Sequence, residues 1–321
     1  MYKTIHNSMP CAKLGGTGAR FGEYTAEAEQ IMTSISNSGK CFDFLSFSFY
    51  PYCLSINGKR YNSDPDVFPA ELNRLTEIIH NSSYENSPVY ITEWDAFSSS
   101  NNYFNDSTWR ACYFAKVFAQ TASKVDMLVS QSFLDIPSNF RDNAPLYGGA
   151  GILTDTFLLK PVFRVLRSFT NMETHIFENI DGCLIGGNSK YRSQIILYNY
   201  RHFDPLFYTM KASDIQPEYL NRFLEKPVSK TFHIELNNID NCEYQVETYS
   251  CNSHHGSPLD LWIKKGCFEY NGKYRLLLLM LDSPLNVNTY VAKAEHGTLT
   301  FDITLSPLEF MSINIMKKNM L

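Results

Sequence analysis

The chain has 321 residues, of which 44% are hydrophobic and 19% charged, so it carries enough apolar material for a core and is not disordered. Its 28 basic and 33 acidic residues give a net charge of −5 without a basic run, which argues against direct nucleic-acid binding. No segment reaches the roughly 18 apolar residues of a membrane span, and the length predicts about two domains.

Eight cysteines are spread along the chain, at positions 11, 41, 53, 112, 183, 242, 251 and 267. None forms a Cys-x-x-Cys pair and their spacing matches no zinc pattern, so we expect neither a metal nor a cofactor. The first residues lack the apolar core of a signal peptide. Reduced, mostly buried thiols in a cytoplasmic protein are the favoured interpretation, although the even count leaves disulfides open.

Strand-like runs alternate with helical patterns in the first half of the chain. The predicted strands span residues 12–14, 42–47, 89–92 and 127–133, and the predicted helices span 26–35, 69–80, 108–123 and 160–169. This alternation indicates parallel β/α units, with strand starts spaced as in a (β/α)8 barrel. Because a closed barrel needs eight units, four indicate either a small open α/β sheet or one half of a barrel.

After residue 171 the pattern changes to short strands with few helices. Strands are predicted at 183–186, 194–200, 231–236, 244–249, 274–281, 298–304 and 309–315, and short helices at 217–224 and 258–264. Regularly spaced strands punctuated by turn residues favour an antiparallel β-sandwich. The fold class expected is therefore α/β plus all-β, divided into residues 1–170 and 171–321.

Glu93 is the residue most indicative of chemistry. It follows the apolar run 89–91 and precedes Trp94, which places a carboxylate at the C-terminal end of a parallel strand. Barrel enzymes keep their catalytic groups at such strand ends, and glycoside hydrolysis requires two carboxyl groups. A single strand-end glutamate is weak evidence, because many such side chains are simply solvated.

Several motifs strengthen this interpretation. They are Lys-Leu-Gly-Gly at 13–16, Asp-Phe-Leu-Ser at 43–46, Tyr-Pro at 50–51, Ile-Thr-Glu-Trp at 91–94, and the segments 105–108, 148–153 and 160–161. In order and spacing they resemble the consecutive strand motifs of glycoside hydrolase family 39, which contains β-xylosidases and α-L-iduronidases. Segments 197–200 and 297–307 resemble that family's C-terminal β-sandwich, so the resemblance covers nearly the whole chain.

The resemblance implies a retaining glycosidase in which Glu93 is the nucleophile. The family's acid/base is the glutamate of an Asn-Glu-Pro motif on the fourth barrel strand, and no Asn-Glu-Pro occurs in this sequence. Segment 13–16 corresponds to the fifth strand. The resemblance therefore implies a fragment with barrel strands five to eight, whose acid/base lies upstream of Met1 or has been lost.

Two positions depart from the family pattern. Ser48 stands where the family has a sugar-contacting histidine, and Gln131 stands where its eighth strand usually has a tryptophan. Losing both groups weakens xyloside binding, which points to a different ligand or a decayed site. The candidate substrate-binding residues are Ser48, Tyr50, Trp94, Gln131 and Asp135, and core packing is the alternative role for Tyr50 and Trp94.

A second function stays open. Segment 198–203 resembles family-39-like domains fused to AraC-type transcriptional regulators, where the domain senses a carbohydrate or dimerises without catalysis. A plain scaffold is a third possibility. The expected partner is a xyloside-like carbohydrate. A half barrel also leaves two open sheet edges, which predicts self-association or association with an upstream N-terminal half. Asp43 and the glycine-rich segment 148–151 are interpreted as structural.

Overall fold

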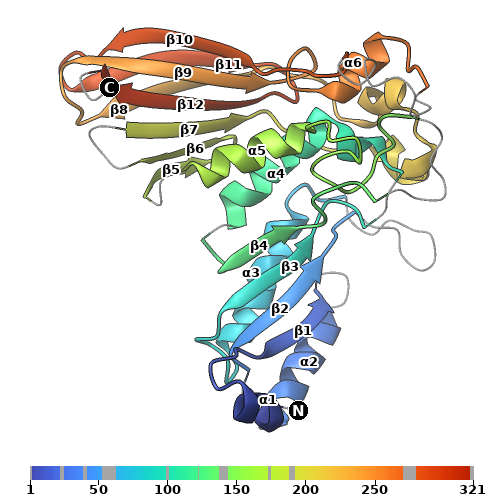
Figure 1. Ribbon diagram of the computed structural model, residues 1–321. Helices are drawn as coiled ribbons and strands as arrows, with labels where there is room; N and C mark the ends of the chain where they lie inside the picture. The colour runs from blue at the N-terminus through green and yellow to red at the C-terminus, as the bar shows by residue number, and fades with distance from the viewer. Residues whose placement is uncertain are drawn as a thin grey trace. The chain divides into compact units, whose positions relative to one another are not determined.

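The structure is a computed structural model that describes residues 2–21, 25–38, 42–52, 63–98, 101–121, 123–136, 144–172, 175–187, 192–269 and 280–318. It contains one parallel sheet and, later in the chain, antiparallel sheets (Figure 1), so the expected mixture of helices and strands is confirmed. The chain separates into two compact units. One comprises Met1–Ser98 and Gln120–Gln131, and the other comprises Ser99–Ala119 and Ser132–Leu321. The division at residue 170 stays a prediction.

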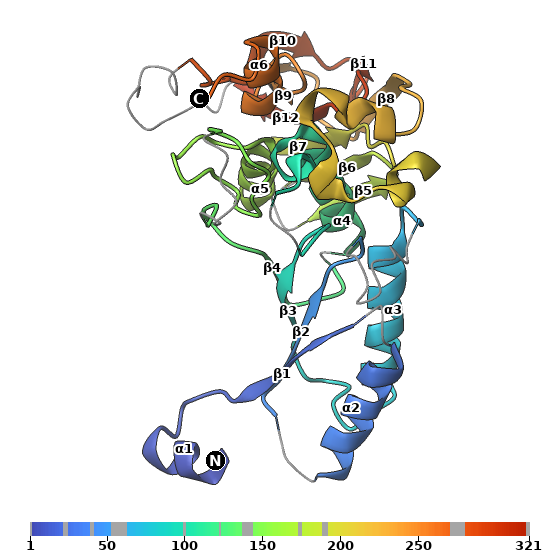
Figure 2. The same ribbon diagram turned by 90° about the vertical axis from the view of Figure 1, so that its right-hand side faces the viewer.

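The first unit is built on a four-stranded parallel sheet in the order β1-β2-β3-β4. Its strands are β1 (Gly15–Arg20), β2 (Phe44–Phe49), β3 (Val89–Trp94) and β4 (Met127–Ser130), and its helices are α1 (Tyr2–Ser8), α2 (Thr25–Asn37) and α3 (Val67–His80). Figure 2 shows α2 and α3 on the same face of this sheet. The strands, helices and parallel pairing agree with the predicted β/α units.

Apolar spacing explains why α3 packs on the sheet. Phe68, Leu72, Leu75 and Ile79 recur every three or four residues and are all buried. The Phe68 ring lies 5.1 Å from that of Trp94 on β3, centroid to centroid. Burying each such side chain contributes about 1.5–3 kcal/mol, so this stripe is sufficient to fix the helix against the strands.

Aspartates hold the N-terminal ends of the strands together. The Leu14 amide donates to Asp43 Oδ2 at 2.6 Å, and the Val89 amide donates to Asp126 Oδ2 at 2.8 Å. Asp43 therefore joins the residues that precede β1 and β2, in agreement with the structural role expected from its position before the strand.

The predicted bounds of β1 are wrong. Residues 12–14 precede the strand, which begins at Gly15, so the two glycines open the strand rather than end it. The β4 strand is also shorter than predicted and stops at Ser130. Both differences have one cause: pairing with the neighbouring strands sets the limits of β1 and β4, and residue type alone does not predict that pairing.

The second unit contains a six-stranded antiparallel sheet in the order β10-β9-β12-β7-β6-β5 and a two-stranded sheet, β11-β8. The strands are β5 (Ile176–Ile180), β6 (Cys183–Gly187), β7 (Arg192–Tyr198), β8 (Lys230–Asn237), β9 (Glu243–Cys251), β10 (Asn286–Lys293), β11 (Thr298–Leu305) and β12 (Phe310–Lys317). Its helices are most of α4 (Thr108–Thr121), α5 (Pro161–Thr170), α6 (Pro258–Lys264) and the 3-10 helices η1 (Tyr103–Asp106), η2 (Pro205–Thr209), η3 (Ala212–Asp214) and η4 (Pro217–Phe223).

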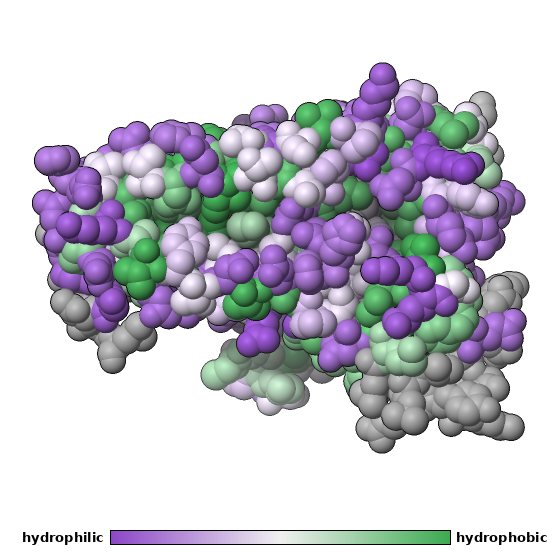
Figure 3. Space-filling view, turned by 90° about the horizontal axis from the view of Figure 1, so that it is seen from above, coloured by the Kyte–Doolittle hydropathy of each residue, from purple (hydrophilic) through white to green (hydrophobic). Residues whose placement is uncertain are grey.

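One hydrophobic core joins these two sheets. Ile195 on β7 and Ile313 on β12 pack in the same cluster as Phe232 and Ile234 on β8. Because side chains alternate along a strand, Gln194 and the residues that flank Ile313 point to the opposite face of the large sheet. Seen from above, green apolar side chains form a band between purple hydrophilic ones (Figure 3).

Two strands of this unit are not predicted from the sequence. Both β5 and β10 are edge strands and are almost entirely exposed, so neither shows an alternating hydrophobic pattern. The strand predicted at 274–281 lies outside the described residues except for 280 and 281, which form a turn. The predicted helix at 258–264 is confirmed as α6, whereas the one at 217–224 is the 3-10 helix η4.

Candidate functional site

Candidate functional side chains of the first unit lie where its parallel strands end. Arg20 is the last residue of β1, Tyr50 follows β2, Glu93 is the fifth residue of β3, and Gln131 follows β4. Every strand of the sheet therefore supplies one such residue at its carboxyl end. This is the edge at which parallel α/β folds place their catalytic groups.

Glu93 is exposed, and its strand neighbour is Ser48. The pairing of β2 and β3 shifts between Phe47 and Ser48, so that Glu93 lies opposite Ser48 in the ladder. Trp94 follows directly and is 0% exposed. The predicted nucleophile therefore reaches solvent, while the residue after it, Trp94, anchors β3 in the core.

Tyr50 holds the Glu93 carboxylate. Its hydroxyl donates a hydrogen bond to Glu93 Oε1, and the Arg20 guanidinium lies 5.4 Å from the centre of its ring. Burial raises the pKa of Tyr50 well above its usual range, and the charges of Glu93 and Asp95 add to this, whereas Arg20 opposes it. Tyr50 therefore remains a neutral hydroxyl donor at any physiological pH.

The remaining candidates of the first unit have mainly backbone contacts or packing roles. The Ser48 carbonyl accepts from the Phe21 amide at 3.1 Å, and the Gln131 amide donates to the Trp94 carbonyl at 3.0 Å. Ser48 is buried and Gln131 is half-buried. Complete burial of Trp94 favours packing over a cleft wall, and sugar contact by any of the three stays a prediction.

Asp135 belongs to the second unit, where it joins a buried ionic cluster. Lys160 Nζ lies 2.7 Å from Asp135 Oδ1 and 2.5 Å from Asp106 Oδ1, and all three side chains are fully buried. Burial raises the pKa of Asp135 to about 6, while Lys160 favours its charged form. This environment favours a structural role for Asp135, and its predicted sugar contact stays a prediction.

The glycine-rich segment is clamped by the same cluster. The Gly148 amide donates to Asp106 Oδ2 at 2.7 Å, and Arg110 donates to the Gly151 carbonyl at 2.7 Å. A Cβ on Gly149 would lie 2.3 Å from the Asp135 carboxyl carbon, so only glycine fits there. These contacts fix the backbone of segment 148–151, in agreement with the structural role expected for it.

Sequence reasoning missed Arg20 and the pairing of Lys160 with two aspartates. Arg20 could have been found from the correct end of β1. The segments that carry Asp106, Gly148 and Lys160 were all recognised as motifs, but a contact across 25 or more positions cannot be inferred from one sequence.

Other ligand-binding groups are scarce in the described residues. Within them, no cluster of three or more histidine, cysteine or acidic side chains could hold a metal ion, and no helix is long and apolar enough to cross a membrane. The cysteines described are free thiols, and Cys112, Cys183 and Cys251 are buried. Burial raises the pKa of Cys251 to about 12, which makes this thiol unreactive.

Comparison with known proteins agrees with this geometry. Residues 2–273 match the model of the glycosyl hydrolases family 39, and the chain belongs to this family. It is 22% identical over 319 residues to a beta-xylosidase from Caldicellulosiruptor saccharolyticus, with 94% of this chain and 59% of the relative covered.

Two solved structures show the same fold. They are the GH39 enzyme from Xanthomonas axonopodis pv. citri and a monomeric beta-xylosidase from Caulobacter crescentus CB15, each with a TM-score of 0.78 and 16% identity. The match covers 98% of this chain but 62% and 64% of those chains. The chain thus spans less than two thirds of the length of these relatives.

Proposed function

We propose that this chain supplies the nucleophile of a retaining glycosidase that acts on β-xylosides or related sugars. The proposal rests on the position of Glu93, whose exposed carboxylate lies at the end of β3 and accepts a hydrogen bond from Tyr50. In a retaining mechanism such a carboxylate attacks the anomeric carbon, and water later hydrolyses the covalent glycosyl-enzyme. Family membership supports this chemistry.

Tyr50 orients the nucleophile in this proposal. Its bond to Oε1 fixes one oxygen of Glu93 and leaves Oε2 for the attack. Because burial and the nearby carboxylates keep the hydroxyl protonated, the donor persists while Oε2 bonds to the anomeric carbon and the glycosidic oxygen leaves with its bonding electron pair. The Arg20 guanidinium above the ring moderates the local negative charge.

The second carboxyl group, the general acid/base, is proposed to come from a different polypeptide segment. Retaining enzymes place it about 5–5.5 Å from the nucleophile. This sequence contains no Asn-Glu-Pro motif, and the neighbouring Asp95 is fully buried, with its Oδ1 bound to the Ala96 amide at 2.6 Å. We propose that residues 1–170 form strands five to eight of a (β/α)8 barrel and residues 171–321 a β-sandwich.

A fluorinated inactivator tests the nucleophile independently of the acid. Fluoride leaves 2-deoxy-2-fluoro-β-xylosyl fluoride without protonation, and the fluorine at carbon 2 slows hydrolysis of the adduct. We expect mass spectrometry to find one sugar on the peptide that carries Glu93. Glu93→Gln should abolish the adduct, whereas Glu77→Gln, on the exposed face of α3, should retain it. An unlabelled natural chain contradicts the proposal.

The departures at Ser48 and Gln131 favour a second candidate, a non-catalytic carbohydrate-sensing or dimerising domain of an AraC-type regulator. Neither a hydroxyl nor an amide replaces the histidine and tryptophan contacts that the family resemblance implies. Calorimetric binding of xylose or a β-xyloside by the natural chain, with no adduct at Glu93, is the result that favours this candidate over catalysis.

We further propose a cytoplasmic location and a tendency to self-associate. The buried free thiols of Cys112 and Cys251 suit a reducing compartment. The β4 strand forms an edge of the parallel sheet, and Met127 and Val129 on it are 43% and 41% exposed. An edge with apolar side chains is a site at which a further polypeptide can pair.

A further inference from the structure

A cavity of about 550 Å³ lies in the second unit between α5 and the face of the six-stranded sheet that is opposite the hydrophobic core. Figure 1 shows α5 beside β6 and β7. The cavity contains no residue of the site around Glu93. Its volume is within the range of about 300–1,000 Å³ that is typical of small-molecule sites.

Two arginines on α5 give this cavity its charge. Arg164 and the exposed Arg167 are about one helical turn apart, and both line the cavity. Arg164 is half-buried, and its Nε lacks a hydrogen-bond partner. Burial lowers the pKa of Arg164, the charge of Asp282 opposes this, and Arg167 adds to it. Neither side chain forms an ion pair in the described part of the chain. An anion would relieve the repulsion between them.

Unused hydrogen-bond acceptors line the opposite wall. Gln194 on β7 is 2% exposed, and its Nε2 donates to Ser312 Oγ at 3.2 Å and to the Ser168 carbonyl at 3.3 Å. Its Oε1 is buried without a partner, and so is Oδ1 of Asn314 on β12. Buried acceptors are normally satisfied, so both oxygens are available to a hydrogen-bond donor bound in the cavity.

From these two walls we propose that the cavity binds a small anionic sugar, a hydroxylated ring that carries a carboxylate or a phosphate. The acidic group would lie against Arg164 and Arg167, and ring hydroxyls would donate to Gln194 and Asn314. Asp282 also lines the cavity, but it is exposed, and one carboxylate against two guanidinium groups leaves a positive charge. This site does not depend on the proposed nucleophile.

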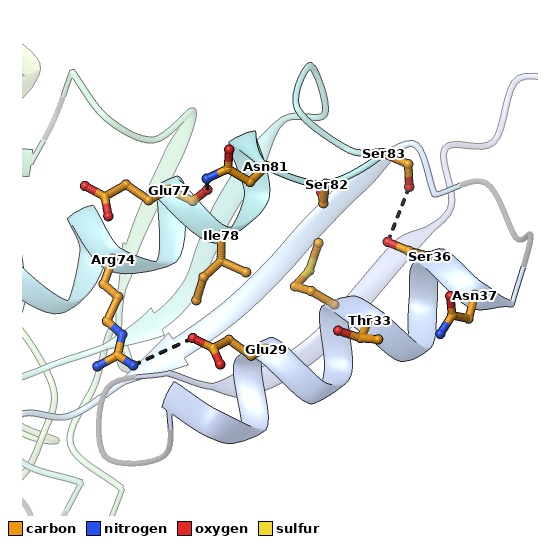
Figure 4. Close-up of a pocket in the computed structure, with 11 residues that line it drawn as sticks. Glu29, Thr33, Ser36, Asn37, Arg74, Glu77, Ile78, Asn81, Ser82 and Ser83 are labelled. Carbon is orange, nitrogen blue, oxygen red and sulfur yellow. Dashed lines mark hydrogen bonds and ion pairs between the residues drawn. The ribbon is translucent and has the colours of Figure 1, made fainter.

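The groove between α2 and α3 in the first unit, shown in Figure 4, is different. There Arg74 and Glu29 form an ion pair at 3.7 Å, and Ser83 donates to Ser36 at 3.4 Å. The Asn81 side chain bonds the Glu77 carbonyl at 2.9 Å. Because its arginine is already paired with Glu29, this groove gives no comparable indication of an anionic ligand.

Calorimetric titration of the whole chain tests the proposal. The ligands are sodium glucuronate, glucose 6-phosphate, inorganic phosphate and neutral glucose. We expect at least one anionic sugar to bind at least about tenfold more tightly than glucose, and the better of the two identifies carboxylate or phosphate as the acidic group. The proposal is overturned if glucose binds as tightly as glucuronate and glucose 6-phosphate. It is also overturned if inorganic phosphate binds as tightly as glucose 6-phosphate.

Variants assign the binding to this cavity. Arg164→Gln and Arg167→Gln should each weaken binding at least about tenfold, whereas Arg222→Gln, which removes an exposed arginine of the same unit, should not. The cavity shares no residue with the site around Glu93, so failure of the proposed nucleophile leaves this test intact. If the arginine variants do not fold, phenylglyoxal modification of the natural chain replaces them: bound ligand should protect Arg164, and unchanged modification refutes the site.

Discussion

At the residue scale, Glu93 and Tyr50 form the pair on which the proposed chemistry depends. Both positions could be predicted from the sequence, because each follows an apolar strand run in the β/α pattern. Their hydrogen bond could not, since it depends on the pairing shift that brings the end of β2 opposite Glu93. The same holds for Arg20, whose place over the Tyr50 ring requires the true end of β1.

Replacing Tyr50 by phenylalanine removes the donor and keeps the ring. We expect Tyr50→Phe to slow labelling of Glu93 by the fluorosugar about 10- to 100-fold, because a misoriented carboxylate loses near-attack geometry. Tyr90→Phe, on the same strand as Glu93, is the matched control and should label at the natural rate. Equal rates for both variants would show that Tyr50 does not orient the nucleophile.

The pKa of Asp135 gives a pH dependence. Burial raises it from 3.8 to about 6, so the folded chain holds this proton more tightly than the unfolded chain does. The resulting stabilisation is complete below about pH 4 and is lost as the pH rises through about 6.

We therefore expect the stability of the natural chain to fall as the pH rises from about 4 through about 6, and the stability of Asp135→Asn to change less over the same range. Thermal melts of both proteins between pH 4 and pH 7 measure the effect. Parallel pH profiles would show that the carboxyl ionises normally in the folded state.

At the element scale, Lys160 joins segments that are far apart in the chain. It precedes α5 and binds Asp106 in η1, Asp135 and the Gly149 carbonyl, which lies 2.8 Å from Nζ. Arg110 on α4 fixes the same loop from another side. The ionic cluster thus fixes the entry of α5, the helix that also carries Arg164 and Arg167.

Lys160→Met should destabilise the second unit by about 3–5 kcal/mol, since it leaves two buried carboxylates without their cation. Lys318→Met, which breaks the exposed pair with Glu243, is the matched control and should leave the stability nearly unchanged, because solvent screens exposed pairs. Urea unfolding followed by circular dichroism measures both. If Lys160→Met lowers the free energy of unfolding by less than about 1 kcal/mol, water or a rearrangement of side chains must replace the contacts that Lys160 makes with the two carboxylates.

Some helices and strands could be predicted from the sequence and others could not. The α3 helix follows from an apolar stripe, and β7 and β12 follow from their buried runs. The β5 and β10 strands have no such signal, because edge strands gain their conformation from ladder bonds to a neighbour rather than from burial. The ionic cluster around Lys160 could not be predicted either, since its members are far apart in sequence.

At the scale of the whole molecule, the first unit leaves two strands, β1 and β4, at the edges of a parallel sheet. We expect the chain to self-associate at micromolar concentration, or to bind a separate N-terminal half, because such edges and exposed apolar side chains favour further pairing. Light scattering with and without that half measures the mass. A monomer with a cooperative melt and no binding of hydrophobic dye contradicts the half-barrel proposal.

A burst assay distinguishes a chain that holds the nucleophile and lacks the general acid from a complete glycosidase. Dinitrophenolate leaves 2,4-dinitrophenyl β-xyloside without protonation, whereas an alkyl β-xyloside requires an acid. We expect a burst of about one equivalent of dinitrophenolate per chain, absent in Glu93→Gln, and no turnover of the alkyl xyloside. Turnover of the alkyl xyloside at about 1 s⁻¹, or the absence of a burst, would contradict it.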